Sequence, residues 1–407
     1  MRVLLIHNRY QQSGGEDEVL RQELASLIAC GHKVSTYLRN NDDIQPGALV
    51  AQLTLGLKTV WAWDSYRELR AVLAAEKPDV AHFHNTFPRI SPAAYDACRA
   101  AGVAVVQTLH NYRLLCPAAI LFRDGKICEE CTEHSLLRSV AHSCYRGSRA
   151  ASGATALMLA VHRARRTWTK RVDCYIALTE FAKRKFIAGG LPAERIAVKP
   201  NFVEPDPGVK TGTGKYALFV GRLSPEKGVR TLLAAWERQH SIPLVIAGDG
   251  PLRAEVEASA RTNSSVVFKG WLPQEEVLSL MKGALFLVFP SEWYEQFPMS
   301  IVQSFACGTP VMFADVGTLP HIVTDNRTGV AFRAGDADNL AEKSVWAWTH
   351  QADMAAMGRE ARSDYETKYT ARRHSDRLME IYELAMRSAG LGARLAEPVT
   401  TCSEGVS

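Results

Sequence analysis

Two cationic side chains stand five residues apart in the segment GRLSPEKG at 221–228, which follows the apolar run YALFVG at 216–221. The guanidinium of Arg222 offers a planar fork of donors and the ammonium of Lys227 a compact point charge, so the pair suits a diphosphate group. A helix that begins beyond them would present its first backbone amides to the same anion. The alternative is a solvated turn with two surface cations, the usual environment of Arg and Lys.

A second polar segment, SEWYEQFPMSIVQSFACGTPV at 291–311, follows the apolar run ALFLVFPS at 284–291. Glu295 stands just past the predicted strand, where a carboxylate can accept hydrogen bonds from sugar hydroxyls; alternatively, it is an acid that stabilises a helix N-terminus. The spacing predicts a helix from Ser300 to Cys307, ended by Gly308. The amides of Phe297 and Met299 are candidate donors to a ligand, whereas the intervening proline has no N–H.

Together the two segments resemble family 4 of the retaining glycosyltransferases, which have the GT-B fold, and the resemblance extends over nearly the whole chain. In that family the Arg and Lys of a GRL…KG loop hold the donor diphosphate, and two Glu separated by seven residues contact the donor sugar and the ribose. The resemblance thus implies diphosphate binding by Arg222 and Lys227 and sugar binding by Glu295. The second signature position holds Gln303, whose uncharged amide makes a weaker hydrogen bond to the ribose.

Two further segments extend the resemblance into the N-terminal half. NRYQQSGGEDEV at 8–19 contains Gly14 and Gly15 and resembles the glycine-rich loop in which the family's backbone approaches donor phosphate and acceptor. TLHNYR at 108–113 places His110 at the end of a central strand, as in relatives whose histidine contacts the donor sugar. The resemblance implies that His110 acts in catalysis together with Arg222, Lys227 and Glu295. A flexible loop and a packed core histidine are the alternatives.

Four cysteines form a separate group around FRDGKICEECTEH. Cys128 and Cys131 make a C-x-x-C pair, and Cys116 and Cys144 flank it, so the four thiolates suit a tetrahedral zinc ion of structural type. Packed thiols and a redox pair are the alternatives. Similar inserts occur in a subset of the family 4 enzymes.

Strand-like and helical patterns alternate along the chain, which predicts parallel βαβ units. The Pro- and Gly-rich stretch at 203–215 indicates a linker, after which the alternation starts again. The alternation therefore predicts an α/β protein with two doubly wound Rossmann-like domains, and the resemblance implies that these have the GT-B arrangement and face one another across a cleft. Its parts are an N-terminal acceptor-side domain at 1–203 with the cysteine insert at about 112–148, a nucleotide-sugar donor domain at 204–370, a C-terminal helix at 371–390 that packs back on the N-terminal domain, and a flexible tail at 391–407.

Two observations bear on whether the protein binds a metal ion, a nicotinamide cofactor or ATP. The run Asp336-Ala337-Asp338 has the form of a metal-binding D-x-D motif, but it opens a helical pattern, so helix capping is the simpler explanation. Neither G-x-G-x-x-G nor a P-loop pattern occurs in the sequence, which leaves nicotinamide binding and ATP hydrolysis without a motif. The charges of Arg222 and Lys227 would take the place of a metal ion, so no cofactor is expected in catalysis.

Basic residues concentrate between His134 and Val172, where eight Arg or Lys occur without any Asp or Glu. The middle of this stretch, ASGATALMLAV at 151–161, is apolar and too short to cross a bilayer, and Trp168 follows it. Such a stretch suits peripheral contact with anionic lipid. The alternative is a helix packed on the sheet with its arginines in water. A basic pattern interleaved with aromatics is missing, so nucleic acid is not an expected partner.

The resemblance implies an enzyme that moves a sugar from a UDP- or GDP-linked donor to a glycan or lipid-linked acceptor with retention of configuration, in cell-surface polysaccharide or glycoconjugate biosynthesis. The first apolar run, Val3 to Ile6, is shorter than a signal-peptide core, so we expect a cytoplasmic location that includes the inner face of the membrane. A GT-B epimerase or phosphorylase explains the two C-terminal segments less well. Gln303 motivates the remaining alternative, a non-catalytic nucleotide-sugar-binding protein.

Overall fold

The computed structural model describes residues 1–9, 14–41 and 49–395, and the expected tail lies outside it from residue 396 on. The chain forms two compact units. Unit 1 holds 1–121, 129–200 and the segment from Ala371 onward, and unit 2 holds 122–128 and 201–370. The expected boundary after residue 203 thus lies three residues beyond the observed one. Residues 122–128 of the expected insert group with unit 2 rather than unit 1. That the two domains face one another across a cleft stays a prediction.

Unit 1 is built on a six-stranded parallel sheet of order β2-β1-β3-β4-β7-β8. Its central strands carry β-branched and other apolar residues on both faces and are buried throughout, as expected for a sheet covered on both sides. The strands are β1 (Arg2–Arg9), β2 (Lys33–Asn40), β3 (Val80–Asn85), β4 (Ala104–Thr108), β7 (Cys174–Ala177) and β8 (Ile196–Val198).

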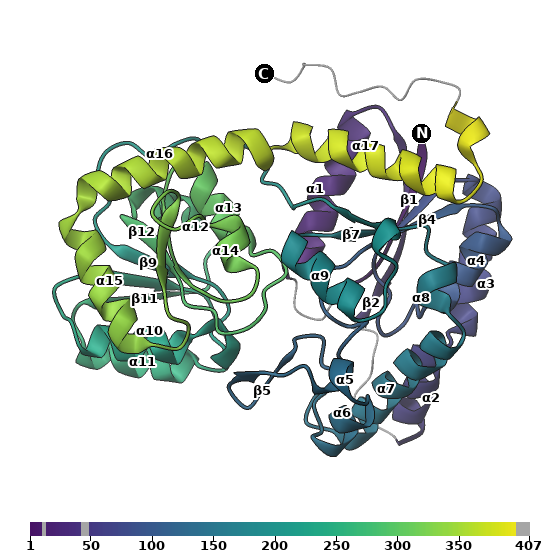
Figure 1. Cartoon of the computed structure of the whole chain (residues 1–407), viewed down its shortest axis with the longest axis horizontal. Coiled ribbons are helices and arrows are strands. Elements are labelled where there is room, and N and C mark those ends of the chain that lie inside the picture. Colours follow the sequence, from purple (N-terminus) through teal and green to yellow (C-terminus); the bar gives the residue numbers. More distant parts are fainter. Residues whose placement is uncertain (10–13, 42–48, 396–407) are drawn as a thin grey trace. The chain divides into compact units, whose positions relative to one another are not determined.

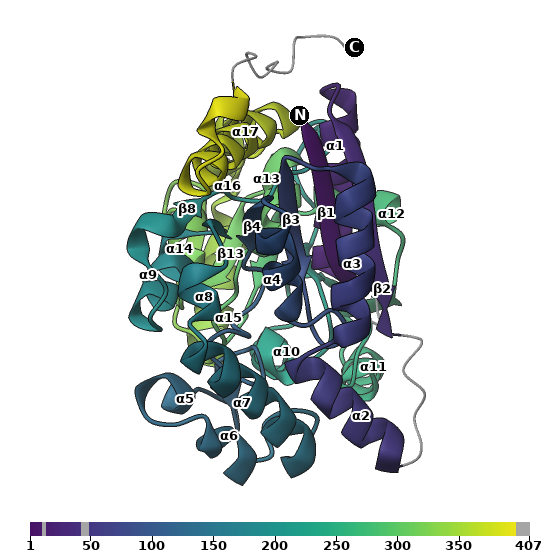
Figure 2. The same cartoon turned by 90° about the vertical axis from the view of Figure 1, so that its right-hand side faces the viewer.

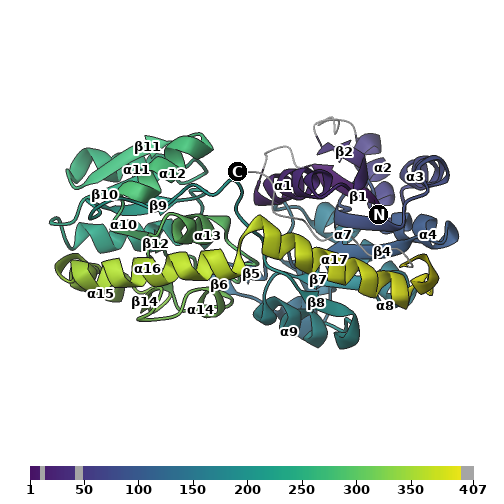
Figure 3. The same cartoon turned by 90° about the horizontal axis from the view of Figure 1, so that it is seen from above.

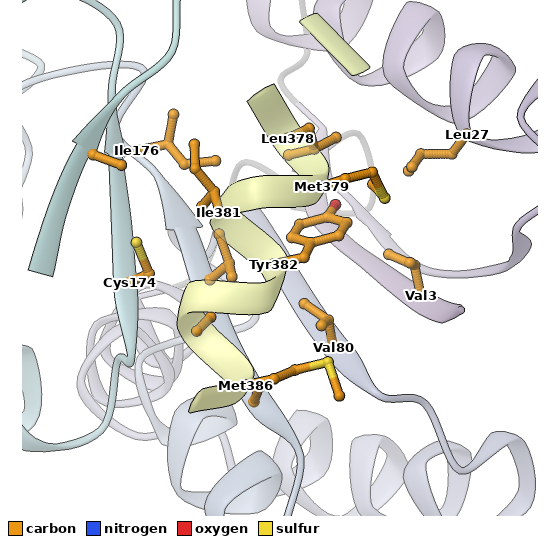
Figure 4. Close-up of a cluster of buried hydrophobic side chains, with 14 of the residues drawn as sticks. Val3, Leu27, Val80, Cys174, Ile176, Leu378, Met379, Ile381, Tyr382 and Met386 are labelled. Carbon is orange, nitrogen blue, oxygen red and sulfur yellow. The ribbon is translucent and has the colours of Figure 1, made fainter. Parts of the chain in front are cut away.

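Helices cover both faces of this sheet. α1 (Gly15–Ala29) and α17 (Ala371–Ser388) cover one face. Figure 4 shows that apolar side chains of α17 pack against those of β1, β3 and β7; the α17 residues labelled there are Leu378, Met379, Ile381, Tyr382 and Met386. On the other face, Tyr95 of α4 packs against Phe83 of β3 and against Trp168. The remaining helices of the main layer are α3 (Trp63–Glu76), α4 (Ala93–Ala100), α8 (Thr167–Lys170) and α9 (Glu180–Ala188), and α3 and α4 lie side by side in Figure 2.

Helices α5 (Glu130–Glu133), α6 (Leu137–Ala141) and α7 (Arg149–Ala164) gather at the end of unit 1 remote from α17, where α2 (Leu49–Val60) lies beside α7 (Figures 1 and 2). The N-cap of α7 is Ser148, whose hydroxyl accepts a hydrogen bond from the amide of Ala151, and α7 buries Met158 and Leu159 on its inner face. The apolar stretch at 151–161 is therefore part of a packed helix, but this helix packs on α2, α6 and α8 rather than on the sheet, as the alternative interpretation had it.

Unit 2 repeats the architecture with a six-stranded parallel sheet of order β11-β10-β9-β12-β13-β14. The strands are β9 (Ala217–Val220), β10 (Leu244–Ala247), β11 (Val266–Gly270), β12 (Phe286–Phe289), β13 (Val311–Ala314) and β14 (Gly329–Phe332), and the hairpin β5 (Phe122–Arg123) and β6 (Lys126–Ile127) belongs to the same unit. The flanking helices are α10 (Val229–Glu237), α11 (Arg253–Thr262), α12 (Gln274–Gly283), α13 (Met299–Ala306), α14 (Leu319–Ile322), α15 (Ala337–Thr349) and α16 (Gln351–Lys368), and α13 lies against α16 (Figure 3).

The order of the second sheet reverses between β9 and β12, because the chain builds β10 and β11 on one side of β9 and then returns to place β12 on the other. Loops at the carboxyl ends of the two strands beside such a reversal diverge and leave room for a ligand. GRLSPEKG follows β9 and SEWYEQFP follows β12, so the fold places both sequence motifs at this point.

Candidate functional site

The two motif loops of unit 2 pack directly against each other. Gly228 has a φ of +68°, and a Cβ atom built there would lie 1.8 Å from the carbonyl oxygen of Pro290. Only glycine fits such a contact in this left-handed conformation. The amide of Glu292 also donates to the carbonyl of Glu226 at 2.9 Å. These backbone contacts hold the GRLSPEKG loop against the residues that follow β12.

Lys227 and Glu295 meet where these loops join. The Lys227 ammonium donates to Glu295 Oε1 at 2.6 Å, and the Ser291 hydroxyl donates to the same oxygen at 2.6 Å. The Glu295 side chain is only 6% exposed, so its charge depends on these two donors. Glu295 therefore has a fixed orientation, and Lys227 has an anionic partner that a bound phosphate would have to replace or join.

A pocket of about 100 Å³ opens beside this ion pair. Arg222, which follows β9, is exposed next to pocket residue Gly221. The pocket walls come from the ends of β9 and β12 and from the first turn of α13: Phe219, Val220, Gly221, Lys227, Phe289, Pro290, Ser291, Pro298, Met299 and Ser300. Unit 2 thus brings Arg222, Lys227, Glu295 and Met299 to one end of its sheet.

α13 supplies the other predicted donor residues. It spans Met299–Ala306, one residue off the predicted helix at each end, and Gly308 follows it with a φ of +69°, which confirms the glycine-terminated helix. The Phe297 ring packs on Tyr369 with ring centroids 5.7 Å apart, so the ring serves the core of unit 2 and only the backbone of Phe297 is available to a ligand. Gln303 is 8% exposed, one turn of α13 beyond Met299.

The D-x-D lookalike has the structural role that the sequence indicated. Asp336 is the N-cap of α15, and its carboxylate accepts a hydrogen bond from the amide of Asn339 at 2.9 Å. Helix capping explains this segment, which confirms the interpretation made from the sequence.

In unit 1 the predicted glycines lie at the start of α1. Gly14 is the N-cap, and its amide donates to the carboxylate of Asp17 at 3.0 Å. A Cβ atom on Gly14 or Gly15 would meet nothing within 4 Å, so packing inside the described residues does not require glycine at either position. Residues 10–13 of the predicted glycine-rich loop lie outside the described residues.

His110 belongs to a buried polar cluster that the sequence analysis did not foresee. Its Nε2 lies 2.9 Å from Nδ1 of His84, and Nε2 of His84 lies 3.2 Å from a carboxylate oxygen of Glu23. His84 and Glu23 are buried, whereas His110 is half-buried. The signal available in the sequence was the alternation His82-Phe83-His84, because residues two apart in a strand share a face of the sheet.

The titration of this cluster follows from its burial. Burial, and after it the neighbouring His82, lower the pKa of His84 to about 3. Burial and then His84 lower the pKa of His110 well below its usual value. Burial alone would raise the pKa of the Glu23 carboxyl, but its interactions with His82, Lys199 and His84 hold that pKa well below the usual range. At neutral pH, Glu23 is therefore an anion and both His84 and His110 are neutral.

The four cysteines are partly or fully buried: Cys116 and Cys131 are buried, and Cys128 and Cys144 are intermediate. Among the described residues, one set of at least three His, Cys, Asp or Glu side chains has its ligand atoms within 4.8 Å of one another, and that set is Glu23, His82 and His84 rather than the cysteines. The zinc site stays a prediction.

The basic stretch differs from its predicted form at Trp168, which is 5% exposed and packs between Tyr95 and His162. The interpretation of Trp168 as a residue at a membrane interface is therefore wrong, because its ring belongs to the core under the sheet. Arg165 and Arg171 both pair with Asp96. Across the part of the chain that the structure describes, no helix combines the length and the apolar character needed to cross a membrane.

Two α/β domains of parallel, doubly wound topology, with a cationic loop and an acidic residue at the strand reversal of the second, define a protein of GT-B type. Comparison with known proteins gives the family. Residues 14–201 match the glycosyl transferase 4-like domain, and residues 203–364 match glycosyl transferases group 1. The chain belongs to the group 1 glycosyltransferases.

Relatives of known name agree with this assignment. The chain is 30% identical over 177 residues to O-antigen chain mannosyltransferase C of Escherichia coli, across 42% of this chain and 47% of that protein. It is 30% identical to the D-rhamnosyltransferase WbpZ of Pseudomonas aeruginosa, across 39% and 42% of the two chains. The chain thus spans less than half the length of these curated relatives.

Solved structures share the fold over almost the full length. The Anabaena protein HepE in complex with UDP has a TM-score of 0.66 at 17% identity, covering 93% of this chain and 99% of that one. Sucrose-phosphate synthase of Thermosynechococcus elongatus has a TM-score of 0.66 at 18% identity, covering 97% and 99%. At these identities the likeness establishes the fold.

Proposed function

We propose that this chain is a retaining glycosyltransferase that uses a UDP- or GDP-linked sugar. The observation that carries the proposal is the junction of the β9 and β12 loops, where Lys227 lines a pocket and pairs with Glu295, and Arg222 is exposed next to pocket residue Gly221. In the reaction, the bond from the anomeric carbon to the diphosphate oxygen breaks, the oxygen of an acceptor hydroxyl forms the new bond, and the proton of that hydroxyl passes to the departing diphosphate. Negative charge develops on the departing diphosphate, and the two cations stabilise it.

The acceptor is a glycan or a lipid-linked glycan of the cell surface. Support comes from the named relatives, an O-antigen chain mannosyltransferase and a D-rhamnosyltransferase. The structures of HepE hold UDP, UDP with glucose, or UDP-glucose, which supports a nucleoside diphosphate sugar as donor. Glu295 then accepts hydrogen bonds from hydroxyls of the donor sugar and Gln303 accepts one from the ribose, and His110 has the sugar-contacting role that the family resemblance implies.

A panel of UDP- and GDP-linked sugars tests the proposal by thermal shift, because a ligand that binds the native state raises Tm. The donor that stabilises the protein is then incubated with and without acceptor, and transfer and donor hydrolysis are measured. We expect one donor class to raise Tm and to be turned over. Binding without any turnover would instead favour the second candidate, a non-catalytic nucleotide-sugar-binding protein, which Gln303 motivates.

Replacement of Gln303 by Glu is expected to keep or to improve donor affinity, by up to about 1 kcal/mol, since a neutral hydrogen bond to the ribose becomes charge-assisted. Isothermal titration with the donor measures the change. Gln239→Glu introduces the same charge at a similarly buried position of unit 2 that follows α10 rather than lying on α13, and it should leave affinity unchanged. A severe loss of binding in Gln303→Glu alone would show that the pocket requires the amide.

A structural zinc ion bound by Cys116, Cys128, Cys131 and Cys144 is a second part of the proposal, and it rests on their spacing in the sequence. Purified protein is expected to contain about one zinc ion per chain by elemental analysis. The double variant Cys128→Ser/Cys131→Ser should lose it, whereas Cys98→Ser on α4 should not. Protein free of metal, with all four thiols open to titration, would refute the assignment.

Peripheral contact with an anionic membrane is the third part of the proposed function. Its support is the exposed surface of α6 and α7, where Leu137 is 73% and Leu157 52% exposed beside Arg138 and Arg149. Flotation with anionic liposomes at low salt is expected to carry the protein upward, and Arg138→Glu/Arg149→Glu should abolish this. Arg387→Glu on α17, at the remote end of unit 1 (Figure 2), is the control. A protein that stays at the bottom at low salt contradicts membrane contact.

A further inference from the structure

One face of the sheet of unit 1 changes from apolar to polar along its strands. Under α1 and α17, residues near the starts of the strands are apolar, such as Val3, Val80 and Cys174, and they belong to the cluster drawn in Figure 4. Toward the carboxyl ends, the positions at the same two-residue spacing are His82 and His84 on β3 and Thr108 on β4. A layer of polar side chains thus lies between the hydrophobic core of unit 1 and the carboxyl ends of these strands.

Glu23 of α1 lies at the centre of this layer. Its oxygen Oε1 is 2.8 Å from Nδ1 of His82 and 3.2 Å from Nε2 of His84. Its oxygen Oε2 is 3.3 Å from the Lys199 ammonium and 3.1 Å from Nε2 of His374. Four nitrogen atoms therefore surround one carboxylate that is 1% exposed, which matches the four acceptor positions of an ionised carboxyl group.

The position of Lys199 favours a hydrogen-bond network over a metal site around Glu23. Glu23, His82 and His84 have the composition of a metal-binding set, but a buried ammonium already lies against the same carboxylate. The pair is neutral without a metal ion, and a divalent cation would be placed beside an unscreened positive charge. The arrangement is therefore a network of donors that converges on one anion.

The donor and acceptor atoms of a carboxylate and of neutral imidazoles determine the direction of the hydrogen bonds from His110 through His84 to Glu23. An ionised carboxylate only accepts, so Nε2 of His84 must carry the hydrogen. A neutral imidazole has one N–H, so Nδ1 of His84 is an acceptor and Nε2 of His110 must donate to it across 2.9 Å. A neutral His110 then has a lone pair on Nδ1. The low pKa values of His84 and His110 agree with both rings being neutral.

We propose that Glu23, acting through His84, is a positioning residue that holds His110 in the tautomer whose Nδ1 accepts a hydrogen bond at the carboxyl edge of the sheet. His110 is the half-buried end of a chain that begins at a fully buried anion, so it is the member that can meet a ligand. This inference rests on the proposed function and deepens it: the group that His110 recognises is a hydroxyl of the donor sugar, which must donate its hydrogen rather than accept one.

The direct test is the tautomer of His110, read by nitrogen-15 NMR of histidine-labelled full-length protein without donor or acceptor. His110→Gln identifies the signal among the twelve histidines. We expect the Nε2–H tautomer in the wild type. In Glu23→Gln the amide can donate to His84 and reverse the chain, so this variant should populate the Nδ1–H tautomer. In His84→Gln the amide NH2 can donate to Glu23 and the amide C=O can accept from His110, so this variant should keep the Nε2–H tautomer. An Nδ1–H tautomer in the wild type, or no change in Glu23→Gln, overturns the proposal, whether or not sugar transfer is detected.

A kinetic test separates positioning from stability. Glu23→Gln leaves Lys199 without a counter-charge, so the double variant Glu23→Gln/Lys199→Met restores neutrality and should recover Tm. If Glu23 positions His110, kcat of the double variant stays about 10–100-fold below that of the wild type although Tm recovers. Recovery of kcat together with Tm would show a purely structural role. His162→Gln, a buried histidine of α7 bonded to Thr167 and to the Val60 carbonyl, is the control and should keep both the His110 tautomer and kcat.

Discussion

Replacement of Arg222 by alanine is expected to lower the rate of sugar transfer about 10²–10³-fold, the usual loss when one stabiliser of developing charge is removed. Arg222 is exposed in unit 2, so this change removes charge without opening a cavity in the core. Arg222→Lys keeps the charge but not the planar fork, and it should recover only part of the rate. Initial rates at saturating donor measure the effect.

Lys227→Ala should cause a loss of similar size, with a second consequence that Arg222→Ala lacks. Lys227 is the cationic partner of the buried Glu295, so its removal leaves that carboxylate with the Ser291 hydroxyl alone. We therefore expect a lower Tm together with the lower rate. Arg230→Ala, at an exposed ion pair with Glu255 in the same unit, is the matched control and should alter neither. Near-wild-type rates in both Arg222→Ala and Lys227→Ala would contradict the assignment of these two residues to diphosphate binding.

The second large effect is a loss of stability in mild acid. His84 and His374 have pKa values of about 3 and about 4 in the folded chain, against an ordinary value of 6.5, because burial and then the neighbouring His82 or Lys199 disfavour their charged forms. Between pH 6.5 and these values the unfolded chain binds more protons than the folded one. The free energy of unfolding therefore falls as the pH falls, by about 1.4 kcal/mol per pH unit for each such group.

Two histidines of this kind predict that unit 1 loses several kcal/mol between pH 7 and pH 4. Below about pH 4.5, Glu23 adds to the loss, because its folded pKa also lies below its unfolded value. Urea unfolding at a series of pH values, followed by signals from unit 1, measures the slope. His84→Gln/His374→Gln removes two of the responsible groups and should flatten it. An equal slope in that variant would contradict the assignment.

The local pattern of the sequence was sufficient for most of the strands and for the motifs. Short runs rich in β-branched and other apolar residues located β1, β3 and β9, because most positions of a strand buried on both faces are apolar. The three-residue β8 and the hairpin of β5 and β6 were not predicted, since segments this short carry too little periodicity. Capping by Asp336 was predicted because an N-cap is a local interaction of three residues.

The tertiary structure alone decided which strand ends are neighbours. Lys227 and Glu295 stand 68 positions apart along the chain, yet the pairing of β12 with β9 brings the Lys227 ammonium to 2.6 Å from Glu295 Oε1. The same holds for the polar layer of unit 1. Glu23, His84, Lys199 and His374 come from α1, β3, the end of β8 and α17, and no local pattern joins them.

The sequence by itself therefore determined the class of most elements, the two-domain organisation and the positions of the two motif loops, because these depend on side-chain periodicity and on residues near one another in the chain. Only the fold decided that Trp168 is buried, that Lys227 and Glu295 form an ion pair, and that His110 ends a chain of hydrogen bonds from Glu23. These facts depend on contacts between residues distant in the chain, which form when sheets and helices pack to exclude water from their apolar faces.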